Sequence, residues 1–280
     1  MKNLLIRTAT GLVFTAAVVL SLVFYEKSTV FFYLLFLFFT VMGTFELVRM
    51  AHKIGIDANL PLALLLSVTL FSIPPFLFAT TSPVVPLCGA VILLALGMAV
   101  VVLELFRFRP NPLGNVALSF LPAFWIALPF TLIGLLLGYH ESSMVLSVFI
   151  LIWLSDTLAY CMGRLFGRHK LCERISPNKT VEGFVFSMVL TVGASLGFYW
   201  IPYFQTPSFP TPWHWAGFAV VVVGFATLGD LVESLFKRSC SVKDSGSILP
   251  GHGGVLDRFD STLLAIPAAS IYWLIFELIR

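Results

Sequence analysis

The sequence predicts an all-α, polytopic integral membrane protein with about nine transmembrane helices. Of its 280 residues, 59% are hydrophobic and only 11% are charged, whereas soluble domains are about one quarter charged. Apolar runs of about 18 residues or more, long enough to cross a bilayer, recur along the whole chain. Lys and Arg gather in alternate connecting segments. These three observations exclude a single soluble globule.

Nine apolar spans follow in order. They cover residues 4–24, 29–48, 60–79, 84–106, 116–138, 142–163, 183–201, 213–236 and 260–279. The first run follows Lys2 and Arg7 but is long for a signal peptide, so it is expected to stay as an uncleaved first span. Two pairs of prolines fall inside the third and fifth spans, where a packed helix bundle accommodates kinks. They are Pro74 with Pro75 and Pro122 with Pro129.

The distribution of cations predicts the orientation. The N-terminal segment and the segments after spans two, four, six and eight hold 15 of the 17 Lys and Arg, and the opposite side holds only Lys27 and Arg280. Because cations remain cytoplasmic, the N-terminus is expected in the cytoplasm and the C-terminus outside. We expect one membrane domain in the cell (inner) membrane. Residues 1–140 would form an N-terminal helix bundle, and residues 141–280 would carry the cytoplasmic catalytic loops.

Two cytoplasmic segments are rich in polar residues of every kind. The first runs from Gly163 to Gly183. The second, from Ser234 to Asp260, holds four cations, three carboxylates, a histidine and four glycines. Orientation alone needs a few Lys or Arg and no acids, whereas a site for a metal ion and polyanionic phosphate needs both. The composition therefore indicates phosphate chemistry at the cytoplasmic surface.

An acidic face is expected on the eighth span. Asp230, Glu233, Ser234 and Lys237 are spaced i, i+3, i+4 and i+7, so they share one face of a helix. At about 1.5 Å per residue, Asp230 lies roughly 10 Å below Lys237, shallow enough to meet a lipid headgroup. Acids within a span are costly and are functional candidates by default. The alternative is a salt bridge from Asp230 or Glu233 to an Arg of another helix.

Three further aspartates are candidates. Asp257 and Asp260, near the start of the ninth span, are either helix-capping or first-turn acids or metal ligands. Taken with Asp230, they make a half-shell of carboxylate oxygens of the kind that Mg²⁺ prefers. Asp230 and Asp257 are the predicted metal ligands, and a second cation is left open. Asp156 is either a buried partner of a cation or a contributor to the site.

Five cations of the two segments are expected to neutralise a triphosphate and the charge that develops during its transfer. They are Lys179, Lys237, Arg238, Lys243 and Arg258. A purely topological role is the alternative, but it does not explain why Lys243 stands next to Asp244.

Glycines in the second segment would let backbone N–H groups approach phosphate oxygens. They are Gly251, Gly253 and Gly254. The neighbouring His252 is either a phosphate donor or a plain loop residue. No Walker-type Gly-x-x-x-x-Gly-Lys-Ser/Thr motif is present in the sequence.

At these residues the chain resembles the phosphatidate cytidylyltransferase family. The family signature has Ser-x-apolar-Lys-Arg, then Lys-Asp-x-small, then Pro-Gly-His-Gly-Gly-apolar-x-Asp-Arg-apolar-Asp, and every position is met between Ser234 and Asp260. The similarity extends back through the segment Ser176–Gly183 and covers about the last 130 residues. Among the departures, Ser187 replaces a glycine that is frequent in the family.

The resemblance implies transfer of a cytidylyl group from CTP to phosphatidic acid, with Mg²⁺ dependence and a homodimer. Nucleic acid is not an expected partner; the lipid bilayer is. The expected catalytic residues are Asp230, Lys237, Arg238, Lys243, Asp257 and Arg258. The expected substrate-binding residues are Ser176, Lys179, Thr180, Glu182, Asp244, Gly251, His252, Gly253, Gly254 and Asp260.

Two other functions remain open from the residues alone. A different CTP- or ATP-dependent lipid phosphotransferase would keep the chemistry and change the donor or the acceptor. A transporter of an anionic solute would use the same acids for a coupling ion. The crowding of polar residues at one membrane edge argues against the transporter.

Overall fold

A computed structural model describes residues 2–82, 84–246, 248 and 253–279, with side chains described from residue 8 onward. The chain divides into two compact units. The first comprises residues 1–139 and 239–258, and the second comprises residues 140–238 and 259–280. The second half of the sequence therefore contributes a segment, 239–258, to the unit that the first half builds.

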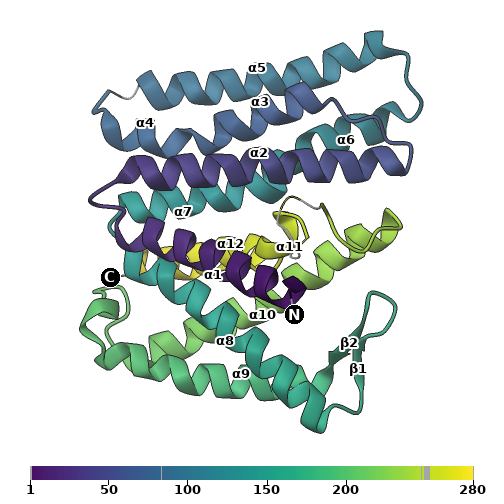
Figure 1. The fold of residues 1–280 in the computed structure, drawn as a ribbon. Helices are drawn as coiled ribbons and strands as arrows, with labels where there is room; N and C mark the ends of the chain where they lie inside the picture. Colours follow the sequence, from purple (N-terminus) through teal and green to yellow (C-terminus); the bar gives the residue numbers. More distant parts are fainter. Residues whose placement is uncertain (1, 83, 247, 249–252, 280) are drawn as a thin grey trace. The chain divides into compact units, whose positions relative to one another are not determined.

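The first unit is a bundle of apolar helices, with α3 between α2 and α5 (Figure 1). Its helices are α1 (Lys2–Val23), α2 (Thr29–Lys53), α3 (Leu60–Phe71), α4 (Ile73–Ala79), α5 (Val84–Arg107), α6 (Pro112–Pro122) and α7 (Leu128–Gly138). Aromatic rings fill the interior beside α2: Phe36 is fully buried, and its ring lies edge-on to that of Phe130, with centroids 5.2 Å apart. Such rings contribute much of the buried apolar area of a core.

The expected proline kinks are present, and each takes a definite form. Helix α3 ends before Ser72, and α4 begins at Ile73 with Pro74 in its first turn. Between α6 and α7 the chain makes one π-helical stretch, Ala123–Ala127, directly after Pro122. A proline removes a helical hydrogen bond and crowds the preceding turn, so the breaks occur where the prolines lie.

The second unit is built on α8 and α9, which lie side by side (Figure 1). Its elements are α8 (Ser142–Phe166), β1 (Lys170–Cys172), β2 (Ser176–Thr180), α9 (Val181–Ser195), the 3₁₀ turns Leu196–Trp200 and Pro202–Phe204, α10 (Pro212–Ser239) and α12 (Thr262–Ile279). The short helix α11 (Leu256–Phe259) lies at the boundary between the units in sequence. Glycine makes the contact between α8 and α9 possible, since a Cβ on Gly183 would lie 2.8 Å from the carbonyl oxygen of Ala159.

The segment 163–183 differs from the loop that the sequence predicts. Helix α8 runs on to Phe166, and strands β1 and β2 pair antiparallel, with Lys170 opposite Thr180. The hairpin is too short and too polar to carry the alternating apolar pattern from which strands are recognised. It leads directly into α9, whose first turn is capped by the Thr180 hydroxyl accepting from the amide of Gly183 at 3.1 Å.

Eight segments among the described residues are long and apolar enough to cross a membrane. They are Thr29–Lys53, Leu60–Ala79, Val84–Arg107, Pro112–Gly138, Ser142–Phe166, Val181–Trp200, Pro212–Ser239 and Leu256–Ile279. The protein is thus an all-α polytopic membrane protein with one short β hairpin. The expected first span corresponds to α1, whose described apolar part, Thr8–Val23, is shorter. A total of nine spans therefore stays a prediction.

Candidate functional site

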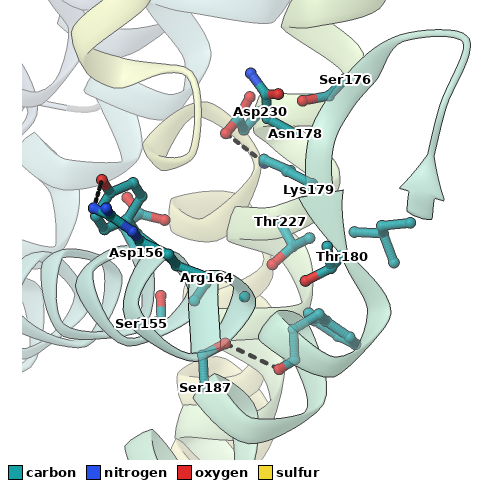
Figure 2. A pocket seen from close by; sticks show the side chains of 15 residues that line it. Ser155, Asp156, Arg164, Ser176, Asn178, Lys179, Thr180, Ser187, Thr227 and Asp230 are labelled. Atoms are coloured by element: carbon teal, nitrogen blue, oxygen red, sulfur yellow. Dashed lines mark hydrogen bonds and ion pairs between the residues drawn. The ribbon is translucent and has the colours of Figure 1, made fainter. Parts of the chain in front are cut away.

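The second unit contains a pocket of about 590 Å³ at the base of the β hairpin (Figure 2). Helix α8, strand β2, helix α9 and helix α10 all contribute to its wall. The lining residues are Ser155, Asp156, Ala159, Tyr160, Gly163, Arg164, Leu171, Ser176, Asn178, Lys179, Thr180, Phe184, Ser187, Thr227 and Asp230. Polar and charged groups therefore meet an apolar wall in one cavity, which is typical of a ligand site.

An ion pair between Lys179 and Asp230 crosses this pocket (Figure 2). Lys179 comes from β2 and Asp230 from α10, and each side chain keeps about a quarter of its surface exposed, 29% and 24%. Asp230 also accepts a hydrogen bond from the Ser234 hydroxyl at 3.3 Å, one helical turn away. The predicted shared face of α10 is confirmed here. For Asp230, the alternative of a salt bridge to an Arg of another helix was wrong, because its partner is Lys179 on strand β2.

The remaining acid of that face has a partner on its own helix. Glu233 is 1% exposed, and its Oε1 lies 3.1 Å from Lys237 Nζ, four residues on. Lys237, a predicted catalytic residue, is thereby held against α10. The next residue, Arg238, donates from Nε to the carbonyl oxygen of Ile175 in the hairpin at 3.4 Å.

Two more aspartates lie in the electrostatic neighbourhood of Asp230. Asp156 on α8 interacts with both Asp230 and Lys179, and Asp260 interacts with both Asp230 and Asp156. Gly229 permits the approach of Asp260, since a Cβ there would lie 2.6 Å from the Asp260 carbonyl oxygen. The Asp260 carboxylate also accepts from the amide of Ser261 at 2.7 Å. Asp156, undecided from sequence, thus belongs to the pocket.

The residues of β2 and the first turn of α9 that are expected to bind substrate fall into two groups. Ser176, Lys179 and Thr180 line the pocket. The carboxylate of Glu182 accepts hydrogen bonds from the amides of Arg168 and His169, at 3.0 and 3.1 Å, and pairs with the His169 ring. Its contacts hold the turn between α8 and β1 in place. Substrate contact by Glu182 stays a prediction.

In the first unit, Asp257 is tied into its own segment. Its Oδ2 accepts from the amide and the hydroxyl of Ser245, at 2.9 and 3.0 Å, and from the amide of Gly254 at 2.8 Å. The backbone N–H of Gly254, expected to face phosphate, donates to this carboxylate. Gly253 has φ +81°, a conformation that favours glycine.

The other predicted residues of this segment are less enclosed. Lys243, Asp244 and Arg258 are exposed, and the amide of Arg258 donates to the carbonyl oxygen of Val255 at 3.0 Å. Gly251 and His252 lie outside the described residues.

Within the described parts of the chain, no cluster of three or more His, Cys, Asp or Glu side chains is arranged to hold a metal ion. Metal binding by Asp230 and Asp257, which belong to different units, stays a prediction.

Sequence reasoning missed Glu46, a carboxylate that contacts the segment of Asp257. It is 2% exposed on α2, accepts hydrogen bonds from the amides of Val255 and Leu256, and lies 2.9 Å from the Ser245 hydroxyl. A signal was available, because an acid inside an apolar span is a functional candidate by default. Its partners lie about 200 positions away in the sequence, so nothing local pointed to them.

A family model and the similar curated proteins both relate this chain to cytidylyltransferases. The model of the cytidylyltransferase family matches residues 5–276. A phosphatidate cytidylyltransferase of Staphylococcus aureus (strain COL) is 43% identical over 143 residues, which are 50% of this chain and 54% of that protein. One from Staphylococcus saprophyticus is 47% identical over 127 residues, 45% of this chain and 47% of the relative. The matched region is thus about half the length of these curated relatives.

Proposed function

This chain belongs to the cytidylyltransferase family, and from that membership we propose that it transfers a cytidylyl group from CTP to phosphatidic acid. The products would be CDP-diacylglycerol and pyrophosphate, for phospholipid synthesis. The observation that carries the proposal is the pocket in which Asp230, Lys179 and Asp156 meet. The similar Staphylococcus proteins, named phosphatidate cytidylyltransferases, support the same substrates.

The reaction is a single in-line displacement. A phosphate oxygen of phosphatidic acid attacks the α-phosphorus of CTP and forms the new O–P bond. The bond from that phosphorus to the oxygen bridging the α- and β-phosphates breaks, and pyrophosphate leaves with the electron pair. Charge stabilisation and positioning are enough for such a step, so no covalent enzyme intermediate is needed.

The expected ligands have the chemistry that a divalent cation prefers. Carboxylate oxygens are hard donors, and Mg²⁺ usually takes one or two from the protein and completes its octahedron with water and phosphate. Asp230 and Asp257 remain the ligands that the sequence predicts for this ion. When bound, Mg²⁺ supplies neutralisation of the triphosphate and of the leaving group.

Lys179 is expected to change partners during the reaction. In the structure its ammonium pairs with Asp230. An ammonium on a flexible stem can move to a phosphate oxygen when the nucleotide arrives, which frees carboxylate oxygens of Asp230 for the cation. Lys237, Arg238, Lys243 and Arg258 would offset the negative charge that opposes the meeting of two phosphates.

The membrane arrangement is part of the proposal. We infer nine spans, with α1 as the first, the N-terminus in the cytoplasm and the pocket on the cytoplasmic side, because 15 of the 17 Lys and Arg fall on one side. The enzyme would act as a homodimer in the cell membrane.

Cysteine labelling tests this orientation in a variant whose four native cysteines are replaced. Glu173→Cys in the hairpin and Gln205→Cys in the turn after α9 are both at exposed positions. An impermeant maleimide should label the second from outside intact cells and the first only after the membrane is opened. The reverse pattern would overturn the orientation.

Labelled nucleotide tests the reaction itself. Purified protein in mixed micelles with phosphatidic acid should transfer label from α-³²P CTP to lipid and release label from γ-³²P CTP as pyrophosphate. Omitting Mg²⁺ should stop both. Transfer of the γ-label to lipid would identify a kinase instead. No labelled lipid from either nucleotide would contradict the proposed activity.

A further inference from the structure

We propose that Glu46 is a positioning residue for this reaction: it holds Ser245, Val255 and Leu256 and thereby places Asp257 and Arg258. The consequence for turnover rests on the proposed function. The anchoring itself rests only on contacts within the first unit.

The carboxylate of Glu46 lies inside the bundle with both oxygens engaged. Oε1 accepts from the amide of Val255 at 2.9 Å. Oε2 accepts from the amide of Leu256 at 3.0 Å and lies 2.9 Å from the Ser245 hydroxyl. A carboxylate that is 2% exposed is costly to desolvate unless donors compensate it, and hydrogen bonds to a charged acceptor are among the strongest in proteins. Glu46 therefore binds the segment strongly.

Ser245 connects this carboxylate to that of Asp257. Its hydroxyl is within hydrogen-bond distance of Glu46 Oε2, at 2.9 Å, and of Asp257 Oδ2, at 3.0 Å. The same Asp257 oxygen accepts from the amides of Ser245 and Gly254. The two carboxylates thus act on one stretch of backbone, and a change at Glu46 reaches Asp257 through a single side chain.

Two glycines of the signature segment are explained by Glu46. A Cβ on Gly246 would lie 2.4 Å from Glu46 Oε1. A Cβ on Gly254 would lie 2.4 Å from Glu46 Oε2 and 2.1 Å from the Ser245 hydroxyl oxygen. All three distances are too short for a side chain, so the backbone at both glycines passes directly against the Glu46 carboxylate. Room for this acid accounts for glycine at these two positions.

Packing alone does not account for an acid at this position. Neighbouring positions of α2 are filled by apolar side chains, among them Leu47 and Val48, each at most 4% exposed. An apolar residue at position 46 would suit the bundle but would leave the amides of Val255 and Leu256 without their acceptor, which is unfavourable for buried groups. The amides of Val255 and Leu256, next to Asp257, need the Glu46 carboxylate as their acceptor. For this reason we assign Glu46 a role in placing Asp257.

The test compares Glu46→Gln with Thr44→Val. The glutamine side chain would keep the size of the glutamate but would turn an acceptor oxygen into an amide donor facing other donors. Thr44 is equally buried on α2, and its hydroxyl has no hydrogen-bond partner among the described atoms. Hydrogen exchange of the amides of Gly254, Val255 and Leu256 is measured by mass spectrometry without nucleotide or metal. Exchange should rise about tenfold in Glu46→Gln, as expected on loss of a charge-assisted bond, and stay at the parental rate in Thr44→Val.

Kinetics of the same variants test the link to turnover. In Glu46→Gln, kcat should fall about tenfold to a hundredfold while KM for phosphatidic acid changes by less than about threefold. The variant leaves the lipid contacts unchanged, but Asp257 and Arg258 lose their placement. The Mg²⁺ concentration for half-maximal rate should rise. Thr44→Val should match the parent in all three.

A milder variant covers the case in which Glu46→Gln does not fold. Ser245→Ala removes only the connecting hydroxyl and should raise exchange of the segment and lower kcat, each by about threefold or more. Parental exchange in the folded variants would overturn the anchoring. Faster exchange with parental kcat would overturn the positioning role and leave the proposed function standing. If the parent forms no labelled lipid, the proposed function fails, and the positioning role with it, while exchange still decides the anchoring.

Discussion

Two carboxylate-bearing regions of this protein hold their acids in different ways. In the pocket of the second unit, Asp230 pairs with the ammonium of Lys179, a long side chain from a hairpin. In the first unit, Glu46 and Asp257 accept from backbone amides of one segment. Amide donors are fixed by the chain, whereas an ammonium can leave for another anion. The ion pair in the second unit therefore suits exchange of Lys179 for a ligand. The amide contacts in the first unit suit a segment that keeps one conformation.

The largest effect on turnover is expected at Asp230, whose ion pair with Lys179 can be exchanged for a ligand. Asp230→Asn removes the charge that pairs with Lys179 and that is proposed to bind the cation, so transfer of α-label from CTP to lipid should fall at least about a hundredfold. Glu173→Gln, at an exposed hairpin position of the same unit, is the matched neutralisation and should keep parental turnover. Both variants should insert into the membrane normally. An Asp230→Asn protein with near-parental turnover would remove Asp230 from the reaction.

A smaller effect is expected at the lysine that is proposed to exchange partners. Lys179→Met removes the ammonium but keeps much of the side-chain volume, so kcat/KM for CTP should fall about tenfold to a hundredfold. Because Asp230 loses its competing cation, half-maximal Mg²⁺ should shift to lower concentration. Lys179→Arg keeps the charge and should restore part of the rate. Parental kinetics in Lys179→Met would show that the ion pair has no part in catalysis.

Thermal stability probes the region of the first unit in which backbone amides donate to Glu46 and Asp257. Gly254→Ala would place a methyl group against Ser245 and Glu46, and overpacking of this kind costs about 1–3 kcal/mol. Gly193→Ala on α9 is the control: a Cβ there meets nothing within 4 Å, and Ala in a helix is favoured over Gly by about 0.5–1 kcal/mol. Thermal unfolding in detergent should show a lower Tm for the first and an equal or higher Tm for the second. Equal Tm values would argue against a tightly packed segment.

The sequence predicts the helices of both units well because each is a long apolar run. It also places the breaks near Pro74 and Pro122, since proline acts on its own turn. The hairpin 170–180 was not predicted, because its strands have three and five residues with a mostly polar pattern. Local pattern is enough for elements whose stability is local or set by the bilayer.

The site was predictable where motif spacing applies and unpredictable where contacts are distant. Asp230 and Ser234 interact across one helical turn, as their spacing indicates. The partner of Asp230, Lys179, lies on another element, and the partners of Glu46 lie about 200 residues away. Only tertiary structure brings such pairs together. Acids within apolar spans mark the candidates, but the spans alone do not identify the partners.

Divalent-cation binding in the presence of nucleotide tests the central claim most directly. Mn²⁺ replaces Mg²⁺ as the probe, and its bound fraction is read by electron paramagnetic resonance on purified protein with CTP and without phosphatidic acid. The account predicts CTP-dependent Mn²⁺ binding in the parent and in Glu173→Gln, and its loss in Asp230→Asn. Parental Mn²⁺ binding in Asp230→Asn would contradict it.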